Sequence, residues 1–344
     1  MLYSPQVFIE GKEILELQQF NLTFQGSNQL NTLNATFSTP DLDKNALFGK
    51  KVELFLNCGT QDNMPIYRGI IKNISSSETS LSIQCLDPRT YISGNDAKTL
   101  VVSDEDNYDG YTAAQFLRHV IDNNINKNNV TNIGLDFLID TDVLVNMTGV
   151  RETGKPLDLI VSRLDESVDE ATQEEPLTFV TDIVEGPNYS NLVIVKQKPL
   201  TTPSSLNLSL HDGVIDYTYK RRPTPTSVDI TSGDRFSSIQ LGSPVHGPFS
   251  VELSKEFSDP AEAQKFGILH LKRLQQQIDE IEITASKGHY CNLESIIDIN
   301  VDSPEIDGPH RLVSKNISYN SGSMSLQLGL NKRPIKVSEF LSKA

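Results

Sequence analysis

The most constraining feature of this 344-residue chain is a segment that occurs twice, 243 positions apart. Residues 67–84 read YRGIIKNISSSETSLSIQ, and residues 310–327 read HRLVSKNISYNSGSMSLQ. The copies align without a gap, and alternating apolar and polar residues predict a β-hairpin in each. Eight of the 18 aligned positions are identical: Arg68/Arg311, Lys72/Lys315, Asn73/Asn316, Ile74/Ile317, Ser75/Ser318, Ser80/Ser323, Ser82/Ser325 and Gln84/Gln327.

The same offset continues upstream of the hairpins, where Leu54 and Leu56 align with Ile297 and Ile299. A constant offset across three strands and both connections predicts a duplicated β-domain, with residues 50–87 and 293–330 sharing one topology. The period of two in the last strand places apolar residues in the core and polar residues on the opposite face. The predicted core residues are Leu81, Ile83, Met324 and Leu326, and the opposite face carries Ser82, Gln84, Ser325 and Gln327.

The length of the chain allows two or three domains, each with its own core. No run of about 18 apolar residues is present, which predicts that the chain does not insert into a membrane. The first residues lack the basic and apolar regions of a secretory signal. Three widely separated cysteines fit neither a disulfide framework nor a zinc cluster and indicate a reducing compartment: Cys58, Cys85 and Cys291.

Negative charge is concentrated in the middle of the chain. The net charge is −15, and residues 101–200 carry 18 Asp and Glu against 7 Lys and Arg, a local net of −11. The other 244 residues therefore carry only −4. Because phosphate binding needs a cationic face, this distribution argues against a protein that binds duplex nucleic acid.

The pattern of periodicities predicts a mainly β fold with an α+β insertion. Short alternating runs predict strands across residues 1–90, which would form a first small β-barrel domain. Residues 91–205 form the predicted acidic α+β middle domain, and residues 206–335 the second β-barrel domain. The second barrel would contain a helical insertion at about 258–279, and residues 336–344 would form a polar tail.

Helices are predicted mainly inside the middle domain. Residues 112–123 begin with capping-box spacing and continue with an apolar stripe, and residues 156–168 show a similar stripe. Residues 177–184 and 191–196 read as a hairpin joined through Gly186-Pro187-Asn188. A third helix is expected from Asp259, which is a candidate N-cap followed by a proline at the first helical position.

No pattern of residues predicts catalysis, a cofactor or a metal. The six histidines are scattered and none has a second ligand at metal-binding spacing. The acidic loop 105–110 has a glutamate at the first position of an EF-hand pattern and Phe116 at the twelfth, where a bidentate glutamate is required. The basic triplet 220–222 is short and has acidic neighbours. The prediction is therefore no catalytic, cofactor-binding or metal-binding residue.

A duplicated unit has a consequence for assembly. Oligomers usually form closed rings, and a threefold ring of chains with two similar β-barrels would place six barrels around one axis. Such a ring is threefold as a whole and pseudo-sixfold in its barrels. It could therefore join a sixfold tube to a threefold spike.

The order of elements resembles that of phage baseplate hub proteins, the late-control or tail-hub family, to which the N-terminal part of type VI secretion spike proteins is related. The resemblance rests on residues 67–71 and 83–87 early in the chain, and on the helix from Asp259, the strand 281–285, and residues 307–313 and 324–328. It covers most of the chain as an order of elements and involves no catalytic signature.

The resemblance implies a homotrimeric structural protein of the virion, located in the tail baseplate and assembled in the host cytoplasm. Its expected partners are the tail tube protein, the central spike protein and neighbouring baseplate proteins, with transient non-specific contact to DNA in a central channel. Lys72 and Lys315 occupy equivalent positions and would recur at matching heights, where they would face the tube protein.

Two other functions remain open at the level of the sequence. The acidic run that includes Asp165, Glu166, Asp169, Glu170, Glu174 and Glu175 could supply the carboxylate pair of a polysaccharide depolymerase. The chain could instead be a carbohydrate- or receptor-binding tail protein. Both readings lack stacking aromatic residues near the acids, and the chain contains no tryptophan.

Overall fold

The computed structural model describes most of the two duplicated regions and shorter pieces between them. The described residues are 4–14, 16–25, 30–38, 44–56, 65–91, 99–101, 111, 115–116, 119, 135–140, 153–156, 158, 178–185, 191–198, 204–221, 226–232, 235–240, 250–254, 260–261, 263–264, 267–268, 271, 279–293 and 295–330.

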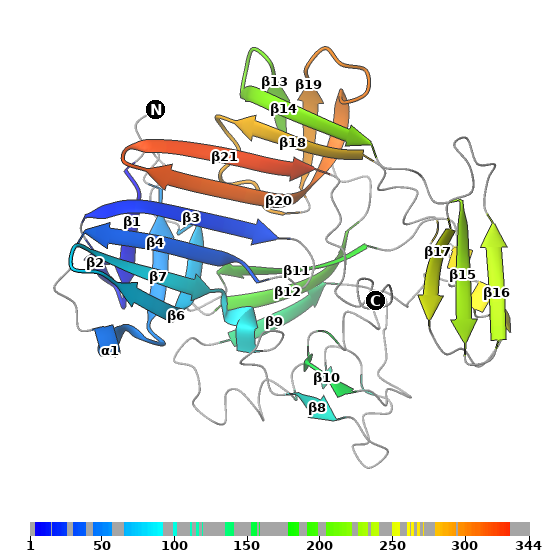
Figure 1. Ribbon diagram of the computed structural model, residues 1–344, viewed down its shortest axis with the longest axis horizontal. Helices are drawn as coiled ribbons and strands as arrows, with labels where there is room; N and C mark the ends of the chain where they lie inside the picture. The colour runs from blue at the N-terminus through cyan, green and yellow to red at the C-terminus, as the bar shows by residue number, and fades with distance from the viewer. Residues whose placement is uncertain are drawn as a thin grey trace.

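One 13-stranded sheet organises the molecule, and both duplicated regions belong to it (Figure 1). The first region forms an antiparallel array in the order β3-β4-β7-β6-β5-β1-β2. In that order its strands are Leu17–Gln25, Thr32–Ser38, Ser80–Leu86, Tyr67–Ser76, Lys51–Phe55, Gln6–Ile9 and Lys12–Ile14. The short helix α1 (Lys44–Leu47) precedes β5.

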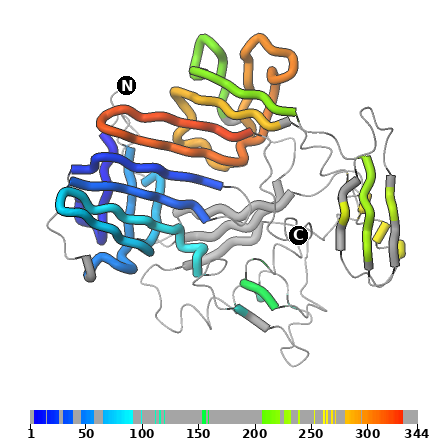
Figure 2. The backbone as a smooth tube through the Cα atoms, viewed as in Figure 1, coloured from blue at the N-terminus to red at the C-terminus, as the bar shows by residue number. Residues whose placement is uncertain are grey.

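The second region contributes the order β14-β18-β21-β20, with β19 beside the first residues of β20 and β13 parallel to β19. In the order β14, β18, β21, β20, β19, β13 the strands are Val214–Arg221, Asp279–Ala285, Ser323–Leu330, Gly308–Asn320, Ile296–Asn300 and Ser204–Ser209. Figure 2 shows this red and orange part of the chain lying along the blue part.

The predicted duplication is confirmed at the level of strand pairing. Leu54 pairs with Tyr67 in the first unit, and Ile297 pairs with His310 in the second, at the same offset of 243. Four hairpin pairs also correspond: Asn73/Gln84 with Asn316/Gln327, Ile74/Ile83 with Ile317/Leu326, Ser75/Ser82 with Ser318/Ser325, and Ser76/Leu81 with Tyr319/Met324.

The two hairpins differ in the position of one irregularity. In the first hairpin the register shifts between Ile71 and Asn73, and in the second it shifts between Leu312 and Ser314. A bulge leaves one residue without a partner opposite it and bends the strand. Lys72 is therefore at the bulge, whereas its equivalent Lys315 pairs regularly with Leu328.

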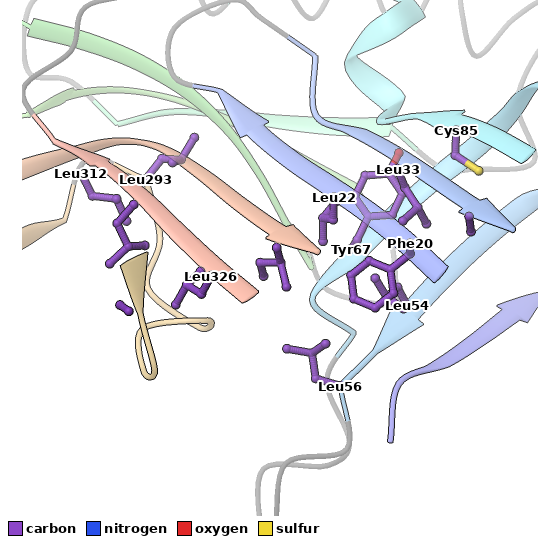
Figure 3. Close-up of a cluster of buried hydrophobic side chains, with 14 of the residues drawn as sticks. Phe20, Leu22, Leu33, Leu54, Leu56, Tyr67, Cys85, Leu293, Leu312 and Leu326 are labelled. Atoms are coloured by element: carbon purple, nitrogen blue, oxygen red, sulfur yellow. The ribbon is translucent and has the colours of Figure 1, made fainter. Parts of the chain in front are cut away.

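The hydrophobic core follows from alternation along these strands, and a single cluster of buried residues spans both units (Figure 3). The core prediction is confirmed for Leu81, Ile83 and Leu326, which are almost fully buried, while Met324 is partly buried against the same cluster. Cys85 lies inside the core, where burial raises the pKa of its thiol far above the ordinary value. Cys85 and Cys291 are free cysteines.

Three smaller sheets account for the other strands. The predicted middle-domain hairpin is confirmed as β11 (Thr178–Glu185) and β12 (Asn191–Lys198), and β9 (Leu135–Asp140) adds to β12 in parallel. A two-stranded pair joins β8 (Leu100–Val101) to β10 (Thr153–Gly154). The third sheet has the order β16-β15-β17 with strands Arg235–Gln240, Ser227–Ser232 and Ser250–Ser254.

The helical predictions are tested only in part. Most of the segments 112–123 and 156–168 lies outside the described residues. In the segment predicted from Asp259, every described residue from Pro260 to Leu271 is helical. Leu271 is buried against Val228 and other apolar residues of the β15–β16 pair. The fold shown by the described residues is thus mainly β, and none of their helices is long and apolar enough to cross a membrane.

Candidate assembly site

The joint between the two units is a contact that the sequence analysis did not predict. Strand β3 of the first unit pairs antiparallel with β20 of the second, from Gln25 opposite Ser314 to Gln19 opposite Asn320. Because β20 also pairs with β21 along the same residues, its backbone is bonded on both edges. We name this β3–β20 ladder the seam.

Apolar side chains bury the core-facing side of the seam. Leu22 lies opposite Ile317, and both are completely buried. Phe20 lies opposite Tyr319, and their rings stack with centroids 5.8 Å apart. Burial of large apolar side chains contributes about 1.5–3 kcal/mol each, and cross-strand aromatic pairs add to that. The seam therefore holds the two units together through the same kind of packing that forms each unit's own core.

A buried lysine belongs to the seam, where Lys315 pairs with Phe24. The side chain of Lys315 is only 6% exposed, and its ammonium donates hydrogen bonds to the carbonyl oxygens of His289 and Cys291 at 2.6 and 2.9 Å. The ammonium also lies 4.3 Å from the centroid of the Phe24 ring. A buried charge is tolerated only when it is well solvated by protein dipoles, and these three contacts supply that solvation. Lys315 thus connects the 289–291 turn to the seam.

His289 shares this environment. Burial and the neighbouring Lys315 charge lower the pKa of the His289 imidazole to about 4. The histidine is therefore neutral and Lys315 charged near pH 7. Because the imidazole stays neutral, a second positive charge is not buried beside Lys315.

The expectation that Lys72 and Lys315 both face the tube protein is wrong for Lys315. Lys72 is half-buried and its ammonium lies 4.8 Å from the centroid of the Tyr91 ring, whereas Lys315 is enclosed within the chain. The physical reason is the pairing of β20 with β3, which covers the second copy of this position. In both copies the lysine ammonium lies over an aromatic ring, Tyr91 for Lys72 and Phe24 for Lys315.

A buried ion pair ends the first hairpin. The guanidinium of Arg89 contacts the carboxylate of Asp87 at 2.7 Å, and both side chains are almost completely buried. The backbone N–H of Asn31 donates to the same carboxylate at 2.6 Å. These contacts fix the 3-10 turn η2 (Pro88–Tyr91) against the start of β4. The pair is fully bonded inside the protein, which identifies it as a structural anchor rather than a reactive group.

The histidines and acidic residues considered as catalytic or metal-binding candidates do not lie close together within the described residues. His119 packs edge-on against Tyr111, while His289 and His310 lie in the second unit and His211 is exposed. Within the described ranges, no three His, Cys, Asp or Glu side chains gather closely enough to hold a metal ion. The acidic loop 105–110 and the acidic run 165–175 lie outside the described residues.

The described chain therefore offers strand edges, a sheet that joins two like units, and fully bonded buried charges. Its fold is shared with solved phage tail proteins and with a component of the type VI secretion system. The comparisons that identify these relatives are structural. No family model matches the sequence, and no curated protein matches it.

Two solved tail proteins match nearly the whole chain. One is the tail protein from Neisseria meningitidis MC58, at a TM-score of 0.70 and 13% identity, covering 98% of this chain and 99% of that one. Another is the 43 kDa tail protein of prophage MuSo2 from Shewanella oneidensis, at a TM-score of 0.69 and 11% identity, with 97% of each chain covered.

A third match is the E. coli c3393 protein, described as a component of the type VI secretion system with structural similarity to the T4 bacteriophage tail proteins gp27 and gp5. Its TM-score is 0.59 at 9% identity, covering 95% of this chain and 77% of that one. At these identities the likeness shows a common fold. The resemblance to tail-hub and secretion-spike proteins that the sequence suggested is confirmed at that level.

Sequence reasoning missed two features of the site. The Asp87–Arg89 pair had a signal, since an Asp-Pro-Arg sequence directly follows an apolar strand. The seam could be predicted only in part. Alternating apolar residues predict that β3 and β20 are strands, but they do not predict that the two strands pair with each other. Long-range pairing is decided by how the two units pack together.

Proposed function

We propose that this chain is a non-enzymatic structural protein of a virion, the trimeric baseplate hub that joins a hexameric tail tube to a trimeric central spike. In this proposal residues 1–90 and 206–335 form the ring around an axial channel that DNA crosses, touching its wall only transiently. The acidic middle domain, residues 91–205, lies at the periphery and contacts neighbouring baseplate proteins. The hub assembles in the host cytoplasm and does not insert into membranes.

The observation that carries the proposal is that the duplication extends to the order and pairing of five strands in each unit. The order β3-β4-β7-β6-β5 in the first unit is matched by β14-β18-β21-β20-β19 in the second, with antiparallel pairing throughout. One chain therefore holds two equivalent structural units. Three such chains supply six units, which is the number that a hexameric tube presents. The fold likeness to tail proteins supports the same assignment.

The near-neutral net charge of the two duplicated regions is compatible with a channel through which DNA passes without being retained. A cationic lining would retain DNA through phosphate contacts. Outside residues 101–200 the net charge is only −4, so the ring-forming units are close to neutral.

The direct test is the mass and shape of the purified chain, alone and with its cognate tube and spike proteins. Mass photometry should give three times 38.2 kDa, and cryo-electron microscopy should show a ring with an open axial channel. The tube protein should bind one face and the spike protein the other. A monomer under all these conditions, or a solid particle with the middle domain on the axis, would disprove the hub assignment.

A further inference from the structure

Two exposed aromatic residues lie at corresponding places in the duplicated units. Phe48 lies shortly before β5 and is 63% exposed, and Tyr290 lies shortly before β19 and is 38% exposed. Strands β5 and β19 are copies of each other, because each pairs with the first residues of a duplicated hairpin. The two aromatic residues are 242 positions apart, within one residue of the offset of 243 that relates the hairpins.

The turns that carry these residues are built alike. The residue before each aromatic is buried, since Leu47 and His289 are both only 7% exposed. In the first turn the N–H of Lys50 donates to the carbonyl oxygen of Leu47 at 3.1 Å. In the second turn the N–H of Cys291 donates to the carbonyl oxygen of Gly288 at 3.1 Å. Each unit therefore presents one aromatic ring from a hydrogen-bonded turn that is anchored inside the protein.

Both turns are also fastened to the same strand of the repeat. In the first unit the N–H of Gly49 donates to the carbonyl oxygen of Ile71 in β6, and the N–H of Ile71 donates to that of Lys50, each at 3.0 Å. In the second unit the ammonium of Lys315 in β20 donates to two carbonyl oxygens of the turn. At the offset of 243, Ile71 corresponds to Ser314, the neighbour of Lys315. Fixed turns lose little conformational entropy when a partner binds.

The two turns lie at the same end of the strands in the joined sheet. Four antiparallel steps separate β18 from β4 in the order β18-β21-β20-β3-β4, so β18 and β4 run in the same direction. Figure 1 shows the arrows of β4 and β18 pointing the same way. The Phe48 turn follows β4, and the Tyr290 turn follows β18. A ring of three chains would therefore present six such turns on one face.

The recurrence of an aromatic ring distinguishes these turns from ordinary surface. A single exposed apolar side chain is common and needs no partner. Only five large hydrophobic side chains are exposed within the described ranges, however, and two of them are at this one position of the repeat. Apart from the ring, the segments 47–50 (LFGK) and 289–292 (HYCN) have no residue type in common. Aromatic residues are enriched at the centres of protein interfaces, where they act as anchors.

We propose that Phe48 and Tyr290 dock the ring onto a sixfold protein partner, with each aromatic ring inserted into an apolar pocket of one partner subunit. The inference rests on the proposed function, in which that partner is the hexameric tail tube. A sixfold partner offers the same pocket six times, and the phenylalanine and tyrosine side chains carry the same six-membered ring. A threefold partner such as the spike has only three equivalent subunits, so it cannot meet both residues in the same way.

The experiment measures binding of the purified cognate tube protein to the immobilised chain by biolayer interferometry. Phe48→Ala and Tyr290→Ala each remove three of the six rings. Each should weaken tube binding by a similar factor, about 30-fold, which is the loss typical of an aromatic anchor. The double variant should show no detectable binding. Binding of the spike protein should stay unchanged in all three variants.

Matched variants separate the aromatic rings from the turns that carry them. Lys50→Ala and Asn292→Ala each remove an exposed side chain two residues further along the same turn, and they should keep tube affinity within about threefold of wild type. The exchanges Phe48→Tyr and Tyr290→Phe keep the ring and should bind as wild type does. Thermal unfolding and mass photometry check that every variant retains the fold and the oligomeric state of wild type.

Each result decides the proposal. Wild-type tube affinity in both Phe48→Ala and Tyr290→Ala overturns the docking role while the hub assignment stands. An effect of only one of the two, or a loss of spike binding instead, shows a threefold contact and overturns the sixfold docking. Equal losses in Lys50→Ala and Asn292→Ala would show that the rings have no special part. Failure of the wild-type chain to bind tube protein overturns the hub assignment and the docking together.

Discussion

At the scale of single residues, Leu326 and Lys315 are both buried in the second unit, although one is apolar and the other is charged. Leu326 is 1% exposed in the shared core, and its neighbour Gln327 is exposed on the opposite face. Lys315 is buried although lysine is among the residues least often found inside proteins. Both positions therefore test how far the core extends across the joint between the units.

Truncating Leu326 to alanine should lower the free energy of unfolding by about 2–5 kcal/mol, because it leaves a cavity in a closely packed core. The matched variant Gln327→Ala removes an exposed side chain and should change stability by less than about 0.5 kcal/mol. Urea unfolding followed by circular dichroism compares them, and equal stability of the two variants would refute the core assignment.

Stability should fall in acid through His289. Its pKa is about 4 in the folded chain, below the usual 6.5, because burial and Lys315 disfavour the imidazolium. Below pH 6.5 the His289 imidazole is protonated in the unfolded chain but stays neutral in the folded chain. The free energy of unfolding therefore decreases as the pH falls toward 4. The loss is about 3 kcal/mol for a shift of this size. Urea unfolding at pH 7 and pH 4.5 should show it.

The matched variant His289→Gln removes the titrating group and should flatten that part of the pH profile. Lys315→Met removes the second cause of the low pKa, so it should raise the pKa of His289 and reduce the acid loss, whatever its effect on stability at pH 7. An unchanged pH profile in His289→Gln would show that other groups carry the dependence.

At the scale of elements, the two hairpins align without a gap but have different turns. In the second hairpin Ser321 and Gly322 both have positive φ, at 47° and 91°, which is the pattern of the type I′ turn favoured between twisted strands. The equivalent residues of the first hairpin, Glu78 and Thr79, are not among the described residues with positive φ. Only the second turn therefore depends on glycine.

Gly322→Ala should destabilise the second hairpin by about 1 kcal/mol, because alanine is strained in the left-handed region. No atom lies near the added methyl group, so the effect reports backbone strain alone. The matched variant Thr79→Ala in the first hairpin should be close to neutral. Thermal unfolding of the two variants makes the comparison, and equal melting temperatures would contradict the assignment of distinct turns.

At the scale of the whole molecule, the proposed hub needs no reactive group. Replacing Glu174 and Glu175 by glutamine should leave assembly and tube binding unchanged, since these acids serve no catalytic step in the proposed function. The purified chain should show no turnover of peptidoglycan or capsular polysaccharide. Turnover that the double variant abolishes would instead favour the depolymerase alternative.

Several elements could be predicted because their information is local. Alternation in residues 80–86 is enough to predict strand β7 and to divide its residues between two faces, since side chains in a strand alternate strictly. The repeat at offset 243 was enough to predict a second copy of the same hairpin. The helix from Asp259 had a capping residue and an apolar stripe, and its described residues are helical.

Other features could not be predicted because they depend on contacts between distant segments. The same Lys-Asn-Ile-Ser sequence is half-buried or exposed in β6 and largely buried in β20, since only β20 has β3 against it. The sequence analysis accordingly placed Lys315 on the surface.

The sequence by itself determined the strand periodicity and the duplication, since these follow from neighbouring residues and from the repeat at a constant offset. Only the tertiary structure decided that the two units share one sheet, that β3 covers β20, and that β14 ends that sheet among the described strands. The physical reason is that backbone hydrogen bonds between strands are nearly independent of side-chain identity. The choice among possible strand partners is therefore made by the packing of whole apolar faces, which forms only when distant parts of the chain meet.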